Sequence, residues 1–108
     1  MIPKQTNITS KHIRDSAQGE ICTLQIAGVC NGNPKTTVLA HLPHNTHGWG
    51  IKATDLCAVY ACSSCHDVLD RRVKHARFEL DRDFYCLRAW VNTLSKLYEK
   101  GIITIKGA

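Results

Sequence analysis

The sequence has little of several features that mark particular classes of protein. Its only methionine is Met1, so a methionine axial ligand for haem is all but excluded, although another histidine could take that place. No apolar run approaches the roughly 18–20 residues of a membrane-spanning helix, and residues 1–20 contain no apolar stretch typical of a signal peptide. We therefore expect a cytoplasmic protein with no membrane partner.

Acidic residues are scarce relative to basic ones. Nine Asp and Glu stand against fourteen Lys and Arg, which gives a formal net charge of +5 at pH 7. This balance favours polyanions such as nucleic acid, although many basic proteins bind none. The 108 residues predict a single domain, residues 1–108, whose small core a bound metal ion would help to stabilise.

Cysteine, in contrast, is abundant, with six residues in the chain. In a reducing compartment such cysteines are metal ligands, catalytic thiols or small core residues more often than disulfides. In an exported chain, Cys22 with Cys30 and Cys62 with Cys65 could instead form bridges. Two further cysteines have no ligand spacing, and we interpret both as core residues: Cys57 and Cys86.

Residues 60–72, YACSSCHDVLDRR, contain a Cys-x-x-Cys-His motif that could serve three functions. It is the attachment motif of c-type haem, which belongs mainly to exported proteins. A redox dithiol would place its two cysteines at the start of a helix, but the βαβ pattern that accompanies such a dithiol is missing here. The third function is zinc binding, because a two-residue gap lets Cys62 and Cys65 reach one tetrahedral ion about 2.3 Å away.

Zinc accounts for the largest number of these cysteines. Cys22 and Cys30 lie at the two ends of a segment earlier in the chain, and together with Cys62 and Cys65 they would complete a structural zinc site. Seven residues separate Cys22 from Cys30, so the chain must bulge or fold back between them. The alternative is that these two are buried apolar residues and that only the second pair matters.

The first half of the chain predicts a short helix followed by a β-hairpin. Ser and Thr before the helix and Gly after it are typical caps, and the next segment alternates with the period of a strand. β-branched residues favour a returning strand after the turn. The predicted elements are a helix over residues 9–18 capped by Thr9 or Ser10 and ended by Gly19, a strand over 21–30, an NGNP turn over 31–34, a strand over 36–42, a loop over 43–54, and a segment over 55–61 that returns to the core.

The second half of the chain predicts two helices. The first begins near Cys65 and runs through Phe78. The second, over residues 80–100, is amphipathic, and Gly101 ends it. We interpret its aromatic residues, Trp90 among them, as core or interface residues rather than as base-stacking ones. The tail IITIK would add an edge strand. The apolar positions of the second helix recur every three or four residues at Phe84, Leu87, Val91, Leu94 and Tyr98.

Histidines close to these elements could form an active site. His66 directly follows Cys65, so the zinc ligands would fix the point from which its imidazole projects. Asp70 lies one helical turn later on the same face, and a histidine and a carboxylate at this spacing can hold a divalent cation. The alternative for Asp70 is a surface ion pair with Lys74. His41 lies on the second strand of the predicted hairpin, and a hairpin followed by a metal-bearing helix is a ββα-metal arrangement.

The stretches AHLP, ATDL and ACSSCHD together resemble the HNH endonuclease superfamily, in which a strand histidine, a middle Asn or Asp and a helix histidine surround one metal ion. The sequence is still more similar to the small YbcO-like nucleases of lambdoid prophages, whose pieces occur here in the same order as SAQGEIC, GVCNGNP, LAHL, HGWGIKATD and ACSSCHDVLDRR. The resemblance covers roughly residues 14–72. It implies an α+β fold: a small zinc-stabilised ββα-metal (HNH-like) core with a short N-terminal helix and a C-terminal amphipathic helix.

Carried over to this sequence, the resemblance makes His41 the general base and Asp55 the middle residue. His66 would be a ligand of the catalytic ion, with Asp70 as a further ligand. The cofactors would be structural zinc and a catalytic divalent metal such as magnesium, manganese or zinc. His41 would take a proton from the water that attacks a DNA phosphodiester, while the cation neutralises charge on the phosphate. Phosphate contacts are expected from three basic residues: Lys52, Arg71 and Arg72.

One position departs from the superfamily pattern. Ala40 stands where an Asp or His ligand often precedes the general base. Asp70, or His44 or His47 in the loop, could replace that ligand. The second hypothesis is therefore a catalytically inactive, zinc-stabilised DNA-binding or recombination-accessory protein. Under either hypothesis the resemblance implies a protein that is encoded by a phage or prophage and binds DNA in the cytoplasm of a bacterial host. It does not determine the oligomeric state, and a homodimer is one option.

Overall fold

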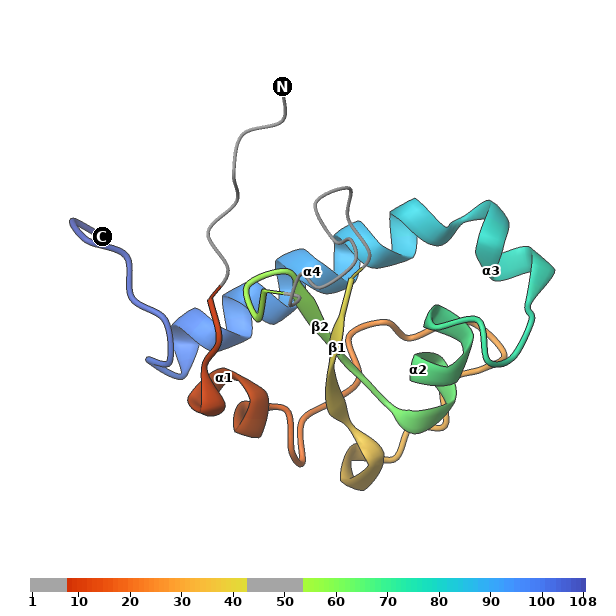
Figure 1. Cartoon of the computed structure of the whole chain (residues 1–108), viewed down its shortest axis with the longest axis horizontal. Coiled ribbons are helices and arrows are strands. Elements are labelled where there is room, and N and C mark those ends of the chain that lie inside the picture. Colours follow the sequence, from red (N-terminus) through yellow and green to blue (C-terminus); the bar gives the residue numbers. More distant parts are fainter. Residues whose placement is uncertain (1–7, 43–53) are drawn as a thin grey trace.

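The computed structural model describes residues 8–42 and 54–108 of the chain. Its elements, in chain order, are α1 (Lys11–Ser16), the 3₁₀ turn η1 (Pro34–Thr36), β1 (Val38–His41), β2 (Ala58–Ala61), α2 (Ser63–Leu69), α3 (Ala76–Leu80) and α4 (Arg82–Glu99). In Figure 1, α4 runs along one edge of the molecule, with α1 towards its C-terminal end and α2 and α3 towards its N-terminal end. No helix of the described residues is both long enough and apolar enough to cross a membrane.

The sheet of the described residues is one antiparallel pair, β1 with β2. Its register pairs Val38 with Ala61 and His41 with Ala58. The sequence predicted His41 on the second strand of a hairpin, but His41 ends the first strand of this pair. All of β2 is buried, and α2 starts two residues after it ends. The chain therefore has the order strand, strand, helix, and residues 58–61 return to the core as predicted.

The strand predicted over residues 21–30, and with it the predicted hairpin, is wrong. This segment folds as turns, because Gln25 has a φ of 45° and its backbone N–H donates to Cys22 Sγ at 3.5 Å. The backbone N–H of Cys30 then reaches back to the carbonyl oxygen of Ile26 at 3.0 Å. Thr23 is buried along with its neighbours Cys22 and Leu24, so burial does not follow the alternation. The backbone N–H of Thr23 donates to the carbonyl oxygen of Tyr60 at 2.8 Å, so the segment contacts β2 there without forming a strand.

The single helix predicted from Cys65 to Phe78 is two helices, α2 and α3. Arg71 follows α2 with a φ of 60°, a left-handed conformation that a helix cannot continue through. The next two backbone N–H groups turn back to the carbonyl oxygen of Asp67. His75 then caps α3, since its Nδ1 accepts the backbone N–H of Phe78 at 3.0 Å.

Helix α1 forms as predicted. Ser10 is its N-cap, with its hydroxyl oxygen accepting the backbone N–H of Ile13 at 3.2 Å, and Gly19 turns the chain away with a φ of 78°. Ile13 is buried in a small cluster that includes Tyr60 of β2. The hydroxyl groups of Ser16 and Tyr60 also lie 2.8 Å apart in a hydrogen bond, so α1 is fixed beside the strand pair.

Helix α4 has the predicted extent, but a different face of it is buried. The residues that it turns towards the rest of the molecule are Ala89, Thr93 and Leu97. Thr93 Oγ1 accepts the backbone N–H of Tyr60 at 3.2 Å and forms a hydrogen bond with the hydroxyl of Thr23 at 2.9 Å, which joins α4 to β2. Four members of the predicted apolar pattern are exposed: Phe84, Leu87, Val91 and Tyr98. Of the two roles predicted for the aromatic residues Phe84 and Tyr98, core or interface, burial in the core therefore does not apply.

The prediction for Trp90 is confirmed, whereas the prediction for the C-terminal tail is wrong. Trp90 is half-buried on the main core, as predicted, and its indole N–H donates to the carbonyl oxygen of Leu56 at 2.8 Å. The edge strand predicted for the tail is wrong, because the described residues 101–108 contain only turns and bends. Ile102 and Ile103 instead pack on the small cluster beside α1.

Candidate functional site

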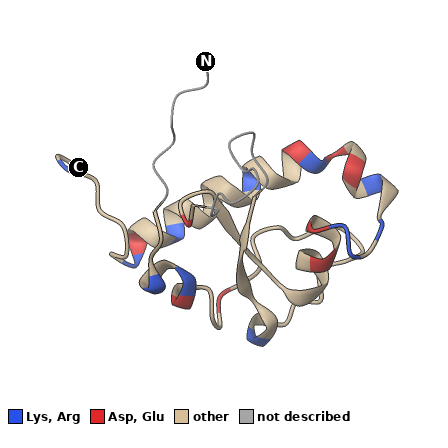
Figure 2. Cartoon of the chain, in the orientation of Figure 1, with Lys and Arg blue, Asp and Glu red and all other residues tan. Residues whose placement is uncertain are grey.

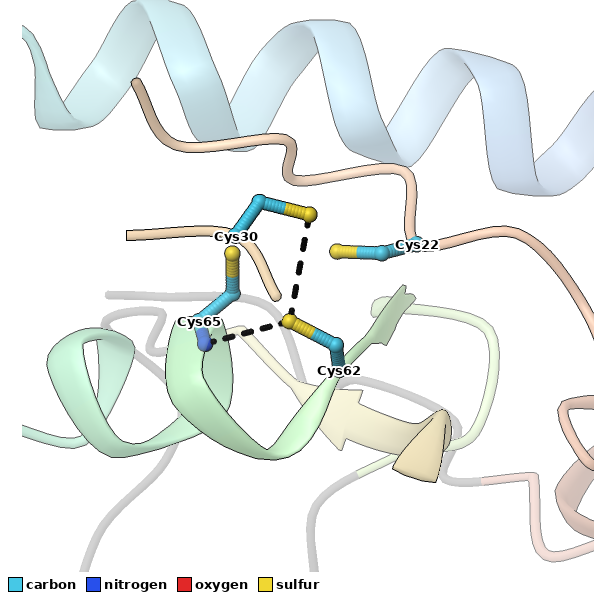
Figure 3. Close-up of side chains that lie close together, drawn as sticks. All are labelled: Cys22, Cys30, Cys62 and Cys65. Atoms are coloured by element: carbon cyan, nitrogen blue, oxygen red, sulfur yellow. Dashed lines mark hydrogen bonds between the residues drawn. The ribbon is translucent and has the colours of Figure 1, made fainter. Parts of the chain in front are cut away.

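Four cysteines from distant parts of the chain converge at the N-terminus of α2 (Figure 3). The sulfurs of Cys22, Cys30, Cys62 and Cys65 all lie within 4.8 Å of one another, and those of Cys30 and Cys62 are 3.9 Å apart. Four sulfurs that each lie 2.3 Å from a tetrahedral zinc ion are separated by about 3.8 Å. The cluster therefore has the donor set and the size to hold a metal ion such as zinc.

Local structure explains how each sulfur reaches this point. Cys62 is the N-cap of α2, and its sulfur accepts the backbone N–H of Cys65 at 3.4 Å. Cys22 makes the equivalent bond to Gln25, so both sulfurs have a backbone donor three residues later. Asn31, next to Cys30, donates to the hydroxyl of Ser63 in α2 at 3.1 Å.

The cysteines of the cluster differ in acidity. A hydrogen bond from the Cys65 thiol lowers the pKa of Cys22 to about 5, and the same bond together with burial raises the pKa of Cys65. Burial also raises the pKa of Cys30. Because thiolates are the ligands of zinc, binding of an ion here would release protons and would strengthen as the pH rises.

The arrangement bears on the three functions of the Cys-x-x-Cys-His motif. The sulfurs of Cys62 and Cys65 face those of Cys22 and Cys30, which a metal site requires and which neither an attached haem nor a dithiol pair does. Cys57 and Cys86 pack half-buried on the main core, as predicted. Burial raises the pKa of both, which keeps them as thiols.

His41 and Asp55 form a closely coupled pair. The Nε2 atom of His41 lies 2.7 Å from Oδ1 of Asp55, a carboxylate that is only 3% exposed. The other oxygen accepts the backbone N–H of Ser10 at 2.7 Å, and the guanidinium of Arg14 lies 3.7 Å away. These partners compensate the burial of the negative charge. Asp55 therefore holds one ring nitrogen of His41, and the side chain of His41 stays about one-third exposed (34%).

A groove of about 350 Å³ lies beside His41, between α1 and β1. His41 lines one part of it, and Arg14, Gln18 and Lys35 contribute polar and basic groups. Asp15 also lines the groove, and its carboxylate pairs with Lys11 at 3.7 Å. The basic side chains come from α1 and from η1, which the sequence separates but the fold brings to one side of the strand pair (Figure 2). The groove can therefore place an anion next to the imidazole of His41.

His66 and Asp70 form a second pair on α2. The Nε2 atom of His66 lies 3.0 Å from Oδ2 of Asp70, and Arg72 approaches the same oxygen at 3.3 Å. Asp70 thus pairs with these two residues. Arg72 also binds Asp67 at 2.9 Å. Arg71, another predicted phosphate ligand, is held by Glu79 at 3.2 Å.

The predicted active-site residues thus form two pairs. In the part of the chain that the structure describes, only the cysteine cluster groups three or more potential metal ligands. Ala40, at the position of the absent ligand, is 1% exposed and belongs to the main core. Three other residues of the predictions lie outside the described residues: His44, His47 and Lys52.

Part of the surroundings of His41 was not predicted from the sequence. Ser10 was assigned only as a helix cap, although its backbone N–H also holds Asp55. Neither Arg14 nor Lys35 belongs to a motif, because only the packing of α1 and η1 beside β1 brings them to His41. No pattern in the sequence could have indicated them.

These features define a small α+β protein with a two-stranded sheet and a four-cysteine cluster that could bind a metal ion. The chain belongs to the family described as "Putative nuclease YbcO", whose model matches residues 11–102. This confirms the resemblance to the YbcO-like proteins.

Two relatives show the same similarity. The chain is 52% identical over 61 residues to "Putative nuclease YbcO" of Escherichia coli strain K12 and to "Putative nuclease ybcO" of Enterobacteria phage 82. The aligned part is 56% of this chain and 64% of each relative, so it spans less than two thirds of their length. A solved structure, described as "Structure of a putative bacteriophage protein from Escherichia coli str. K-12 substr. MG1655", is similar with a TM-score of 0.64 and 37% identity over 83% of this chain and all of that one.

Proposed function

We propose that the protein is a metal-dependent DNA endonuclease of the HNH (ββα-metal) type, encoded by a phage or prophage. The observation that carries this proposal is the 2.7 Å contact between Nε2 of His41 and the buried carboxylate of Asp55. It lies at the end of the first strand of a strand–strand–helix unit, and the helix carries His66. The nuclease names of the family and of its relatives agree with this activity.

The pair explains how His41 would act as the general base. An ionised Asp55 accepts a hydrogen bond from the N–H group at Nε2 of His41. The lone pair on Nδ1 of His41 can then take a proton from water. The water oxygen then bonds to phosphorus, the bond from phosphorus to the leaving oxygen breaks, and that oxygen takes a proton from solvent. Asp55 also stabilises the imidazolium that results, as a carboxylate does behind a catalytic histidine in other hydrolases.

His66 and Asp70 are the residues that would hold the catalytic ion. Neighbouring ligands of an octahedral ion with bonds of about 2.1 Å are roughly 3 Å apart, and the two ligand atoms are 3.0 Å apart. Magnesium commonly uses only one or two protein ligands and completes its shell with water and phosphate oxygens. A divalent cation bound by these two residues would neutralise charge that develops on the phosphate and the leaving oxygen.

The substrate backbone would follow the groove beside His41. Lys35 is positioned there to bind phosphates, whereas Arg14 already lies 3.7 Å from the carboxylate of Asp55. Lys52, Arg71 and Arg72 were predicted from the sequence for this role, but Arg71 and Arg72 already hold carboxylates. We therefore expect the groove to contribute more to phosphate binding than the segment after α2.

The four-cysteine cluster would hold structural zinc. All four positions are filled by protein sulfurs, which leaves no coordination site open for substrate. The ion would fix the first turn of α2 and with it the position of His66, one residue after Cys65. Its role is therefore to build the helix that carries the catalytic ligand.

A second candidate function is an inactive DNA-binding or recombination-accessory protein. The observation that favours it is the burial of Ala40 in the main core, where no cation ligand can be supplied. Such a protein would keep the zinc cluster and the basic groove. It would bind DNA without cleaving it.

Cleavage of plasmid DNA by the zinc-loaded full chain, with magnesium or manganese, distinguishes the two functions. We expect nicking by the wild type, and a loss of rate of about 10²–10⁴-fold in His41→Ala, which removes the general base. His66→Ala should also lose activity, with partial recovery at high metal concentration. His12→Ala, which removes an exposed histidine of α1, is the matched control and should cleave normally.

Two results would count against the proposal. DNA binding without cleavage by any divalent metal would support the accessory function. Cleavage that survives both His41→Ala and His66→Ala would show that the active site lies elsewhere.

A further inference from the structure

Helix α4 carries an apolar face that the fold leaves exposed. Phe84 is 62% exposed, Leu87 60%, Val91 52% and Tyr98 46%. Monomeric proteins expose single apolar residues routinely, but a row of large ones along one helix marks an interaction surface. Nothing in the described part of the chain covers this row.

The spacing of the row is that of a coiled-coil seam. Its members, with Leu94, alternate steps of three and four residues, which is the a and d pattern of a heptad repeat. Position a is occupied by Phe84, Val91 and Tyr98, and position d by Leu87 and Leu94. Leu80, one heptad before Leu87, ends α3 and is 80% exposed. We call Phe84, Leu87, Val91, Leu94 and Tyr98 the α4 seam.

Most of the α4 seam points away from the molecule's own core, whereas Leu94 is half-buried and packs on the small cluster beside α1. The residues by which α4 packs on β2 are Ala89, Thr93 and Leu97, which are the f, c and g positions of the same heptads. On a helical wheel, the direction in which Ala89, Thr93 and Leu97 point is well separated from the direction in which the a and d positions point. A second helix can therefore lie along the seam without displacing any residue of the fold.

Charges beside the α4 seam indicate the direction of the partner helix. Asp83 occupies a g position and Arg88 the following e position, where one guanidinium nitrogen of Arg88 donates to the carbonyl oxygen of Leu24 at 3.1 Å. In a parallel pair, position g of one helix faces the next e position of the other, so two opposite-charge pairs would form across a two-fold axis. An antiparallel pair would instead bring e positions together and place Arg88 near its own copy. Among parallel coiled coils, leucine at d with a β-branched residue such as Val91 at a favours two helices over three or four.

We propose that the α4 seam binds the same seam of a second copy of this chain, in a parallel two-fold arrangement. The inference rests on α4 alone and is independent of the proposed nuclease activity. Two copies joined in this way hold two His41–Asp55 pairs on opposite sides of the helix pair.

Sedimentation of the zinc-loaded full chain between about 1 and about 500 µM tests the proposal. We expect a monomer–dimer equilibrium for the wild type and a dissociation constant raised at least about tenfold in Leu87→Glu, because that variant brings two carboxylates together in the seam. Leu87 is exposed in the monomer, so the variant should keep its circular dichroism spectrum and zinc content. Asn92→Glu, at an exposed position outside the seam, is the matched control and should dimerise normally.

Crosslinking tests the direction of the two helices. On mild oxidation, Leu87→Cys should form a disulfide-linked dimer because the d positions of parallel helices face each other; Asn92→Cys and the wild type should not. A chain that stays monomeric throughout the concentration range, or a dimer unaffected by Leu87→Glu, would overturn the proposal. A dimer in which Leu87→Cys crosslinks only when Val91→Cys is added would overturn the parallel arrangement.

Discussion

The carboxylate of Asp55 connects three parts of the chain. It binds His41 at the end of β1, the backbone N–H of Ser10 at the start of α1 and, at 3.7 Å, Arg14. The backbone N–H of Asp55 adds a bond to the carbonyl oxygen of Ile8 at 2.7 Å. A residue that the resemblance assigns to the active site is therefore also a fixed point of the fold. A substitution of Asp55 would change both the active site and the fold, so His41 is the residue to test for catalysis.

At the same scale, we expect substitution of a cluster cysteine to affect zinc binding and stability, and substitution of a core cysteine outside the cluster to affect neither. We expect Cys62→Ser to lose bound zinc and cooperative unfolding together, because a closed structural site contributes its binding free energy to folding. Cys86→Ser, which changes a half-buried thiol outside the cluster, should keep both. Metal analysis and a thermal melt of each purified variant provide the measurement. A Cys62→Ser protein that is metal-free yet melts at the wild-type temperature would refute the structural role.

Different signals predicted different parts of the site: spacing indicated residues that are close along the chain, the need for four ligands added Cys22 and Cys30, and the family resemblance added His41 and Asp55. Spacing indicated the pairing of Cys62 with Cys65 and of His66 with Asp70, since both pairs lie on one helical segment. The approach of Cys22 and Cys30 was predicted together with a strand, and their sulfurs meet although that strand does not exist. The groove residues depend on packing between distant elements, which spacing does not encode.

At the scale of elements, the corner between α3 and α4 depends on Glu79. Its carboxylate accepts bonds from Arg82 at 2.8 and 2.9 Å and from Arg71 at 3.2 and 3.3 Å. Chiefly through Arg82, the pKa of Glu79 falls from 4.5 to about 2. A carboxyl group with a lowered folded-state pKa stabilises the fold above its unfolded pKa, and this stabilisation is lost as the pH falls from about 4.5 to about 2.

Glu79→Gln should therefore unfold at a lower urea concentration than the wild type at pH 7, and this difference should narrow as the pH falls through that window. Loss of zinc in acid affects both proteins and cancels in the comparison. Glu99→Gln, which removes an exposed carboxylate in the last turn of α4, should show a smaller difference at pH 7. A difference for Glu79→Gln that is constant with pH would contradict the role of the ion pairs.

Elements with strong local signals were predicted well, and those that depend on distant contacts were not. The cap at Ser10 and the glycines at 19 and 101 mark the limits of α1 and α4. The break after α2 occurs at Arg71, a residue type that gives no sign of a left-handed conformation. In α4, the apolar spacing did not indicate the buried face, because Ala89, Thr93 and Leu97 pack inwards while most of the α4 seam stays exposed.

At the scale of the whole molecule, the net charge of +5 does not make every basic residue equally available to a polyanion. Figure 2 shows acidic and basic residues side by side around α3, where ion pairs join Arg71, Arg72 and Arg82 to carboxylates. Charges paired in this way contribute less to binding of a polyanion than free ones. The groove beside α1 is therefore the better candidate for DNA contact.

We expect Lys35→Ala to weaken DNA binding and to reduce the slope of log affinity against log salt by about one, the value for a single phosphate contact. Lys106→Ala, in the exposed tail, should change neither quantity. Fluorescence anisotropy with labelled duplex DNA at several salt concentrations measures both. If Lys35→Ala binds like the wild type while Arg72→Ala loses affinity, the DNA follows the segment after α2 instead.

The cysteine cluster also has a consequence for the time course of folding. Cys30 and Cys62 are 32 residues apart in the chain, and Cys22 lies farther away still, so an ion that binds all four sulfurs must close long loops against their entropy. The local order of α1 and α4 can form early, whereas the turns around Cys22 and Cys30 form no strand and contact β2 through Thr23, whose partner Tyr60 is 37 residues away in the chain. Newly made chains would thus wait for metal in a partly ordered state, exposed to proteases, and the supply of zinc would determine how quickly the protein matures.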